Sequence, residues 1–168
     1  SSLAIGDLNG DGKPDLATAD TDYGIVSRFL NGGDGSFRAR RDYRTPFHPE
    51  GVAIGDLNGD GKPDLVTANG EGQTVSVFAN RGDGSFRPRR DYRAGEGTHA
   101  VAIGDLNGDV KPDLATADFG AKTVSVLANA TGMCVAPNVK GKTLPLAKQT
   151  IVRANCRVGK IRRDYSKI

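Results

Sequence analysis

The architecture follows from one ten-residue string, DLNGDGKPDL, which occupies Asp7–Leu16. The string returns unchanged at Asp56–Leu65. It returns again at Asp105–Leu114 as DLNGDVKPDL, where Val110 stands in place of a glycine. Successive copies lie 49 positions apart. A fixed period of this length indicates a chain assembled from repeated structural units, each of which buries its apolar face against a neighbour.

Each unit predicts four short β-strands around this string. The first is the AIGD run that leads into it, and the second is the LATAD or LVTAN run that follows it. The apolar residues of the first strand predict burial on both faces. The third strand alternates, as in TVSVF, where Val75 and Val77 are expected to face away from Phe78.

The fourth strand is predicted from the basic runs FRARRDYR, starting at Phe37, and FRPRRDYR, starting at Phe86. An Asp-Gly turn separates it from the third strand, which is typical of a β-hairpin. Pro88 lacks the N–H group that a central strand needs, so this strand is expected at the edge of its sheet. Four antiparallel strands in this order, from inside to outside, are typical of a β-propeller blade.

The predicted fold class is therefore all-β, a fragment of a β-propeller with three blades followed by a small partial α+β module. The blades are expected at about 1–49, 50–98 and 99–130. The third unit has no GDGSF turn and no fourth strand, so the last blade is expected to lack its outer strand. Our hypothesis is that the chain is an interior fragment and that sequence upstream of Ser1 completes this blade.

The repeated string also has the spacing of a calcium loop. Oxygen-bearing side chains fall at positions 1, 3, 5 and 9, a glycine permits a sharp turn at position 6, and the main-chain carbonyl at position 7 points inward. Three carboxylates in one loop repel each other unless a cation is bound. The candidate ligands are Asp7, Asn9, Asp11, Lys13 and Asp15 in the first loop, Asp56, Asn58, Asp60, Lys62 and Asp64 in the second, and Asp105, Asn107, Asp109, Lys111 and Asp113 in the third.

Two other interpretations of the string are a plain turn and an EF-hand. Asn-Gly and Asp-Gly also form turns without any metal, but three copies that keep all four ligand positions favour calcium. An EF-hand needs flanking helices and a glutamate at position 12, where this chain has threonine in β-prone sequence. At position 6 of the third loop, Val110 is expected to adopt a positive φ at a cost of ~1–2 kcal/mol, so the third site should bind calcium more weakly.

The motif D-x-N-x-D-G-x-x-D, followed by the LATAD-type strand and N-x-G-D-G-S-F, resembles the FG-GAP/VCBS repeat over about residues 1–130. This family includes the propeller of integrin α-chains. The resemblance implies a calcium-stabilised propeller that lies outside the cell, secreted or at the cell surface, and serves adhesion or ligand binding. It also implies that the Asp and Asn positions named above are metal ligands, with Val110 as the one departure.

Residues 134–168 differ in composition from the rest, with nine Lys or Arg against one acidic residue. The runs V-x-G-K-T-L and C-R-V-G-K resemble the start of a PASTA domain, of which about half the expected length is present. Thr143 can cap a helix in this segment. In an exported protein Cys134 and Cys156 are expected to pair as a disulfide; two free thiols are the alternative.

The sequence also limits the partners and activities. It has no apolar run of the ~20 residues that a membrane span needs and no nucleic-acid-binding signature. Arginines in the fourth strands either protect the sheet edge or bind an acidic polysaccharide. No nucleophile–base pair is evident, so we expect a binding scaffold and not an enzyme, with a protein or a glycan such as peptidoglycan as ligand. The alternative is an accessory region of a secreted polysaccharide- or lipid-degrading enzyme.

Overall fold

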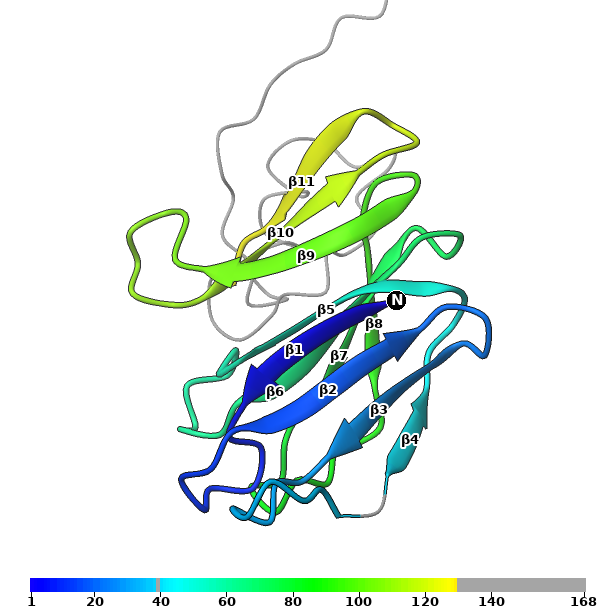
Figure 1. The fold of residues 1–168 in the computed structure, drawn as a ribbon. Helices are drawn as coiled ribbons and strands as arrows, with labels where there is room; N and C mark the ends of the chain where they lie inside the picture. Colours follow the sequence, from blue (N-terminus) through cyan, green and yellow to red (C-terminus); the bar gives the residue numbers. More distant parts are fainter. Residues whose placement is uncertain (39, 130–168) are drawn as a thin grey trace, which may run out of the picture.

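A computed structural model describes residues 1–38 and 40–129 as three antiparallel sheets (Figure 1). Blade 1 consists of β1 (Ser2–Gly6), β2 (Asp15–Asp20), β3 (Ile25–Phe29) and β4 (Arg41–Arg44). Blade 2 consists of β5 (Pro49–Gly55), β6 (Asp64–Asn69), β7 (Thr74–Phe78) and β8 (Arg90–Arg93). Blade 3 consists of β9 (Thr98–Gly104), β10 (Asp113–Asp118) and β11 (Thr123–Leu127).

The order of the strands confirms the prediction from the repeat. In each sheet the strands pair with their neighbours in sequence, so the first strand is innermost and the last is outermost. The registers place Gly6 opposite Asp15 and Gly55 opposite Asp64, so most of the repeated string forms the loop that connects the first two strands of its blade. In the described residues blade 3 has three strands, as predicted from its missing turn.

Three details of the strand predictions were wrong. The fourth strands are shorter than predicted. In blade 2 the strand β8 begins only at Arg90, so Pro88 lies before it, and the expected strand start at Phe86 forms only an isolated bridge with Asn80. The inner strands of blades 2 and 3 begin several residues before the AIGD run, at Pro49 and Thr98. Finally, β1 is not buried on both faces, because no blade of the described chain lies outside blade 1.

The blades pack face to face and bury two apolar clusters. The cluster between blades 1 and 2 includes Leu8 and Val26 from one blade and Phe78 from the other. The cluster between blades 2 and 3 includes Val75 and Val77 together with Leu114. The predicted alternation of the third strand is thereby confirmed, because the valines and Phe78 of β7 face opposite neighbours.

Inner strands of neighbouring blades lie side by side, with β5 between β1 and β9 (Figure 1). Within the described part of the chain, no helix has the length and apolarity needed to cross a membrane. The predicted PASTA-like module, its helix, and both cysteines (Cys134 and Cys156) lie outside the described residues.

Candidate functional site

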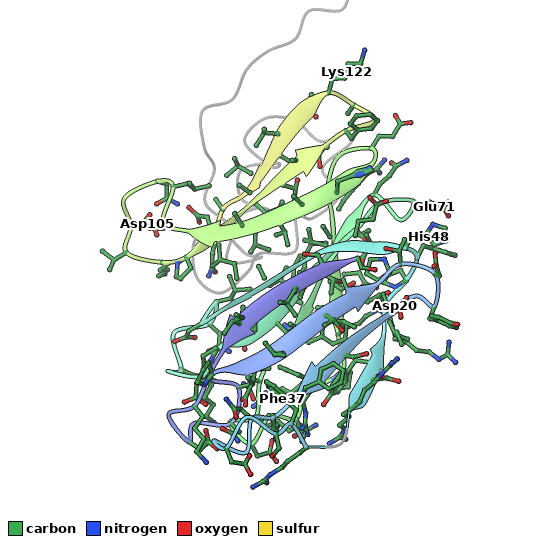
Figure 2. The ribbon with its side chains drawn as sticks, viewed as in Figure 1. Asp20, Phe37, His48, Glu71, Asp105 and Lys122 are labelled. Atoms are coloured by element: carbon green, nitrogen blue, oxygen red, sulfur yellow. The ribbon has the colours of Figure 1, made fainter. Side chains whose placement is uncertain are left out.

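The three repeated loops connect the two inner strands of each blade. They emerge where β1, β5 and β9 end, and therefore share one end of the assembly. Figure 2 shows Asp105 at this end of blade 3, whereas Lys122, in the turn between β10 and β11, lies at the opposite end. Because each loop joins the two strands of one hairpin, its two ends are held close together before any ion binds.

In every loop the aspartate at position 1 binds the backbone of its own loop. Oδ1 of Asp7 accepts the N–H of Gly10 at 2.7 Å, and Oδ2 accepts that of Gly12 at 2.8 Å. Asp56 and Asp105 accept the N–H groups of the corresponding residues, also at 2.7–2.8 Å. The loop is thus wound around its first carboxylate. Its Oδ1 already accepts at least two N–H groups, whereas Oδ2 accepts one and keeps a second lone pair for a cation.

The residues at positions 3 and 5 form successive local turns. Oδ1 of Asn9 accepts the N–H of Asp11 at 3.0 Å, and Oδ1 of Asp11 accepts that of Lys13, also at 3.0 Å. The second and third loops repeat both bonds. These bonds hold the side-chain oxygens of alternate residues in fixed directions, as wrapping around a hard cation requires.

The aspartate at position 9 has a structural role that the spacing did not reveal. Asp15 is fully buried, and its two oxygens accept the N–H groups of Leu8 and Asn31, both at 2.8 Å. Asp64 and Asp113 bind the equivalent groups in their blades. This carboxylate therefore fastens the loop to the end of the third strand, and calcium ligation by it stays a prediction.

Lysine at position 7 also makes a contact that sequence reasoning missed. Nζ of Lys13 donates to the carbonyl of Gly32 at 3.0 Å, and Nζ of Lys62 donates to that of Arg81 at 3.1 Å. Both bonds span 19 residues and reach the Gly-Asp-Gly turn that follows the third strand. The sequence contains a sign of this contact, because the lysine and the turn residue are 19 positions apart in both repeats.

Backbone angles confirm the expectation for position 6. Gly12 and Gly61 both have φ of +78°, and Val110 has φ of +68°. A Cβ added at Gly12 or Gly61 would meet no atom within 4 Å, so the penalty at this position comes from the backbone conformation and not from crowding. Val110 is 89% exposed and gains no packing that would offset its strain.

Electrostatics differ between the outer and inner carboxylates of these loops. Burial acts to raise the pKa of Asp7, but the N–H groups of Gly12 and its neighbours outweigh it and hold that pKa below its ordinary value. The N–H of Val110 is foremost in lowering the pKa of Asp105. Burial raises the pKa of Asp64, and the negative charges of Asp60 and Asp56 add to the increase. The carboxylates of one loop are thus close enough to repel each other.

The donor set fits a calcium ion chemically, since it consists of hard oxygens from carboxylates, an amide and a main-chain carbonyl. Each loop is closed by hydrogen bonds to its first carboxylate, and a bound cation would offset the repulsion between the carboxylates of the loop. Among residues 1–38 and 40–129, however, no group of three or more His, Cys, Asp or Glu side chains is assembled closely enough to hold a metal. Asp15 and its counterparts face the backbone, which leaves two carboxylates at the outside of each loop.

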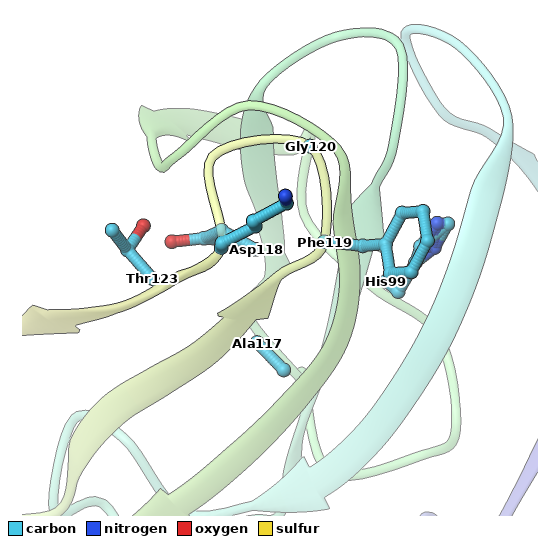
Figure 3. A pocket seen from close by; sticks show the side chains of 7 residues that line it. His99, Ala117, Asp118, Phe119, Gly120 and Thr123 are labelled. Atoms are coloured by element: carbon cyan, nitrogen blue, oxygen red, sulfur yellow. The ribbon is translucent and has the colours of Figure 1, made fainter.

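The end of the assembly opposite the loops contains a hollow of about 610 Å³ in blade 3 (Figure 3). It is lined by His99, Ala117, Asp118, Phe119, Gly120, Lys122 and Thr123. Phe119 is 77% exposed, and its ring meets the ring of His99 edge to face at 5.3 Å. An exposed aromatic ring beside the lysine side chain suits a ligand that has both apolar and polar faces.

Beside this hollow, His99 contacts the neighbouring blade. Its Nδ1 lies 2.6 Å from Oε2 of Glu50, which occupies the equivalent position in blade 2. Asp118 is buried and accepts hydroxyl bonds from Thr98, Thr116 and Ser125. The hydroxyl groups are committed to this carboxylate, and among the described residues at this hollow no nucleophile is paired with a base.

Comparisons with known proteins agree with the repeat. The model of a family described as FG-GAP-like repeat matches residues 7–67 and 56–116, which together make up more than half of the chain. A search of curated proteins finds no match.

Two solved structures are similar to this chain. One comes from work on recognition of non-reducing terminal N-acetylglucosamine by a lectin of Agrocybe aegerita; it is 24% identical with a TM-score of 0.51, over 77% of this chain and 38% of that one. The other is a mutant Tc holotoxin pore of Photorhabdus luminescens, 24% identical with a TM-score of 0.48, over 68% of this chain and 6% of that one. The chain therefore spans well under half the length of either protein, and at this identity the lectin shares the fold alone.

Proposed function

Because this chain belongs to the FG-GAP-like repeat family, we propose that it is a calcium-binding β-propeller module, and that it acts outside the cell as a scaffold for adhesion or ligand binding. The family match and the three sheets support a binding or scaffold module of propeller type. The proposal of calcium rests on one observation, which is that three loops with the same ligand spacing wind identically around their first carboxylate.

In this proposal calcium stabilises the end of each blade. Bound there, the ion supplies the positive charge that offsets the repulsion between the loop carboxylates. The side chains at positions 1, 3, 5 and 9 and the carbonyl at position 7 hold it, and the buried aspartate at position 9 also keeps the loop attached to the third strand. The lysine at position 7 adds a second attachment, to the turn after the third strand.

Calcium titration and thermal melting of the chain test this proposal. We expect heat of binding at two strong sites and one weaker site, and a lower melting temperature after a chelator is added. Asp56→Asn should remove or weaken one strong site, because it takes charge from the carboxylate around which the loop is wound. Asp22→Asn is the matched control: it removes an exposed carboxylate in the turn between β2 and β3, at the opposite end. A chelator without effect on melting would rule out a stabilising ion.

We further propose that the ligand binds at the end opposite the loops, in the hollow beside Phe119. Soluble peptidoglycan fragments and an acidic polysaccharide are the first candidates, since a planar ring suits a sugar and the nearby Lys122 suits an acidic group. Phe119→Ala should weaken binding of the active fragment about tenfold or more. Tyr23→Ala is the control, because Tyr23 is an equally exposed aromatic in the matching turn of blade 1. Equal binding by both variants would place the site elsewhere.

The exposed arginines of β4 and β8 favour the acidic polysaccharide among these candidates. Arg40 and Arg89, which directly precede these two strands, are each paired with an aspartate of the strand that follows. The second candidate function is an accessory region of a secreted polysaccharide- or lipid-degrading enzyme, with catalysis elsewhere in a longer protein. Neither function involves nucleic acid or insertion into a membrane. Binding to a polymer without any hydrolysis by the chain itself is expected in both cases.

A further inference from the structure

One residue of β3 departs from the repeat. Blades 2 and 3 contain V-S-V at 75–77 and 124–126, whereas blade 1 contains V-S-R at 26–28. Because the side chains of a strand alternate between its two faces, Arg28 lies on the same face as Val26, which is fully buried toward blade 2. Blade 1 therefore places a guanidinium group at a position where blades 2 and 3 have an apolar side chain.

Arg28 also lies opposite a second arginine. In the pairing of β3 with β4, at the outer edge of blade 1, its partner is Arg41 (Figure 1). Directly opposed side chains on antiparallel strands are neighbours, and two like charges in such a pair destabilise the sheet. The equivalent pair in blade 2 is Val77 with Arg90, which has no such repulsion. The cross-strand pair of arginines is thus a feature of blade 1 that blade 2 does not share.

Neither member of this pair is neutralised by a carboxylate of the described residues. The guanidinium of Arg41 is exposed and lies 5.6 Å from the ring centroid of Tyr43. Asp42 of the same strand accepts instead from Ser27 and Arg40. Nε of Arg28 is buried and meets no hydrogen-bond acceptor among residues 1–38 and 40–129. A buried charged donor without an acceptor is costly, and an oxyanion held by both arginines supplies the acceptor and the opposite charge.

Positive charge continues along the outer strands of blades 1 and 2. Arg44 of β4 and Arg93 of β8 are exposed, and neither forms an ion pair within the described part of the chain. Arg89 connects the two edges, because its Nη1 donates to the carbonyl of Arg44 at 3.2 Å. A polymer with anionic groups at intervals can therefore contact both edges at once.

The tyrosines of these outer strands are not available for stacking. Tyr92 is buried, and Tyr43 packs edge to face against Phe78 and Phe86. Single-stranded nucleic acids bind through bases stacked on exposed aromatic rings as well as through their phosphates. The arginine edges offer charge without such rings, which favours a polymer that is recognised through its anionic groups alone.

We propose that Arg28 and Arg41 form an oxyanion site that holds a carboxylate or sulfate group of an acidic polysaccharide. Both guanidinium groups donate to the oxygens of one such group, while Arg44 and Arg93 attract further groups along the polymer. The inference goes beyond the proposed function, because the site belongs to blade 1 and shares no residue with the calcium loops or with the hollow beside Phe119.

Binding of two polymers to the whole chain tests the proposal, with polygalacturonate as a carboxylate polymer and dextran sulfate as a sulfate polymer. Arg28→Gln and Arg41→Gln should each weaken binding of the preferred polymer about tenfold or more. Arg90→Gln is the matched control, because it removes the same charge from the equivalent position of blade 2, and should weaken binding about twofold or less. Arg28→Lys keeps the charge but loses the planar fork and should still weaken binding.

Thermal melting separates a ligand-binding role of Arg28 from a structural one. Arg28→Val restores the residue of the other two blades and should raise the melting temperature of the free chain, since it removes a like-charge pair and a buried donor without an acceptor. The preferred polymer should raise the melting temperature of the unmodified chain more than that of this variant.

Several results would overturn the proposal. They are binding of neither polymer, equal losses for Arg28→Gln and Arg90→Gln, an Arg28→Lys variant that binds like the unmodified chain, and an Arg28→Val variant that melts below it. Tighter binding of poly-glutamate or of a single-stranded oligonucleotide than of both polysaccharides would assign the arginines to another class of partner and contradict the proposal equally.

Discussion

Replacing Val110 by glycine should repair the third calcium loop. Val110 holds φ of +68° and is 89% exposed, and its two counterparts are glycines at +78°. A side chain with a Cβ costs ~1–2 kcal/mol in this region, and a β-branched one is a rarer occupant still. Glycine relieves that strain but adds freedom to the unfolded chain, which costs about 0.5–1 kcal/mol. The net gain in folding free energy is therefore small, from about 0 to 1.5 kcal/mol.

The effect on calcium is larger if the strain is present only in the bound loop. In that case the whole 1–2 kcal/mol weakens binding, and glycine should tighten the third site about tenfold, since 1.4 kcal/mol corresponds to a factor of ten. The N–H of Val110 donates to Oδ2 of Asp105 at 2.8 Å, a contact within the loop that does not require an ion. If the loop keeps this shape in solution, part of the strain is present before binding and will appear in stability.

Isothermal titration of Val110→Gly and melting in the presence of a chelator separate these two effects. Titration should change from two strong sites and one weak site to three similar ones, and melting should change little. Gly61→Val is the reciprocal variant and should weaken one of the strong sites. Val110→Ala is the control for the Cβ and should behave much more like valine than like glycine. Three equal sites in the unmodified chain, or an alanine variant that equals the glycine variant, would refute the argument from backbone strain.

Three further predictions concern stability. Burial acts to raise the pKa of Asp118, but the hydroxyls of Ser125, Thr116 and Thr98 outweigh it and hold that pKa below its ordinary value. The ionised carboxylate therefore stabilises the fold above the unfolded pKa of about 3.9, and this stabilisation is lost as pH falls through the folded pKa. Asp118→Asn should make the melting temperature less dependent on pH between about pH 5 and 2, and an unchanged profile would contradict this prediction. Asp64→Asn should destabilise by about 1–3 kcal/mol in denaturant titration, because its amide cannot accept from both buried N–H groups, whereas the exposed Asp83→Asn should be nearly neutral. Gly51→Ala should lower the free energy of unfolding by about 1–3 kcal/mol, since its Cβ would lie 2.7 Å from the carbonyl oxygen of His99. Gly104→Ala is the control and should leave stability nearly unchanged, because a Cβ there meets no described atom within 4 Å. Equal melting temperatures for these two variants would refute the packing argument.

Local patterns in the sequence were sufficient for much of this structure. The period of 49 residues predicted the repeated blades, and the alternation in 74–78 predicted which side chains face which neighbour. The outer position of the fourth strand was also predicted correctly, although Pro88, on which that prediction rested, lies before β8. The positive φ of Val110 followed from its place within ten residues, whereas the calcium ligands named from the same spacing stay a prediction. These features depend on contacts between residues close in sequence, so a short window contains the information that specifies them.

Only the tertiary structure decided how each copy of the repeat is used. Leu8, Leu57 and Leu106 are the same residue in the same motif, but the first two are buried and the third is exposed, because burial depends on whether another blade lies against that face. The bond from Asn80 to Leu8 and the contact between His99 and Glu50 likewise join different blades. A repeat specifies each surface by its own residues, but whether that surface is covered depends on a neighbour that lies far away in the chain or on another molecule.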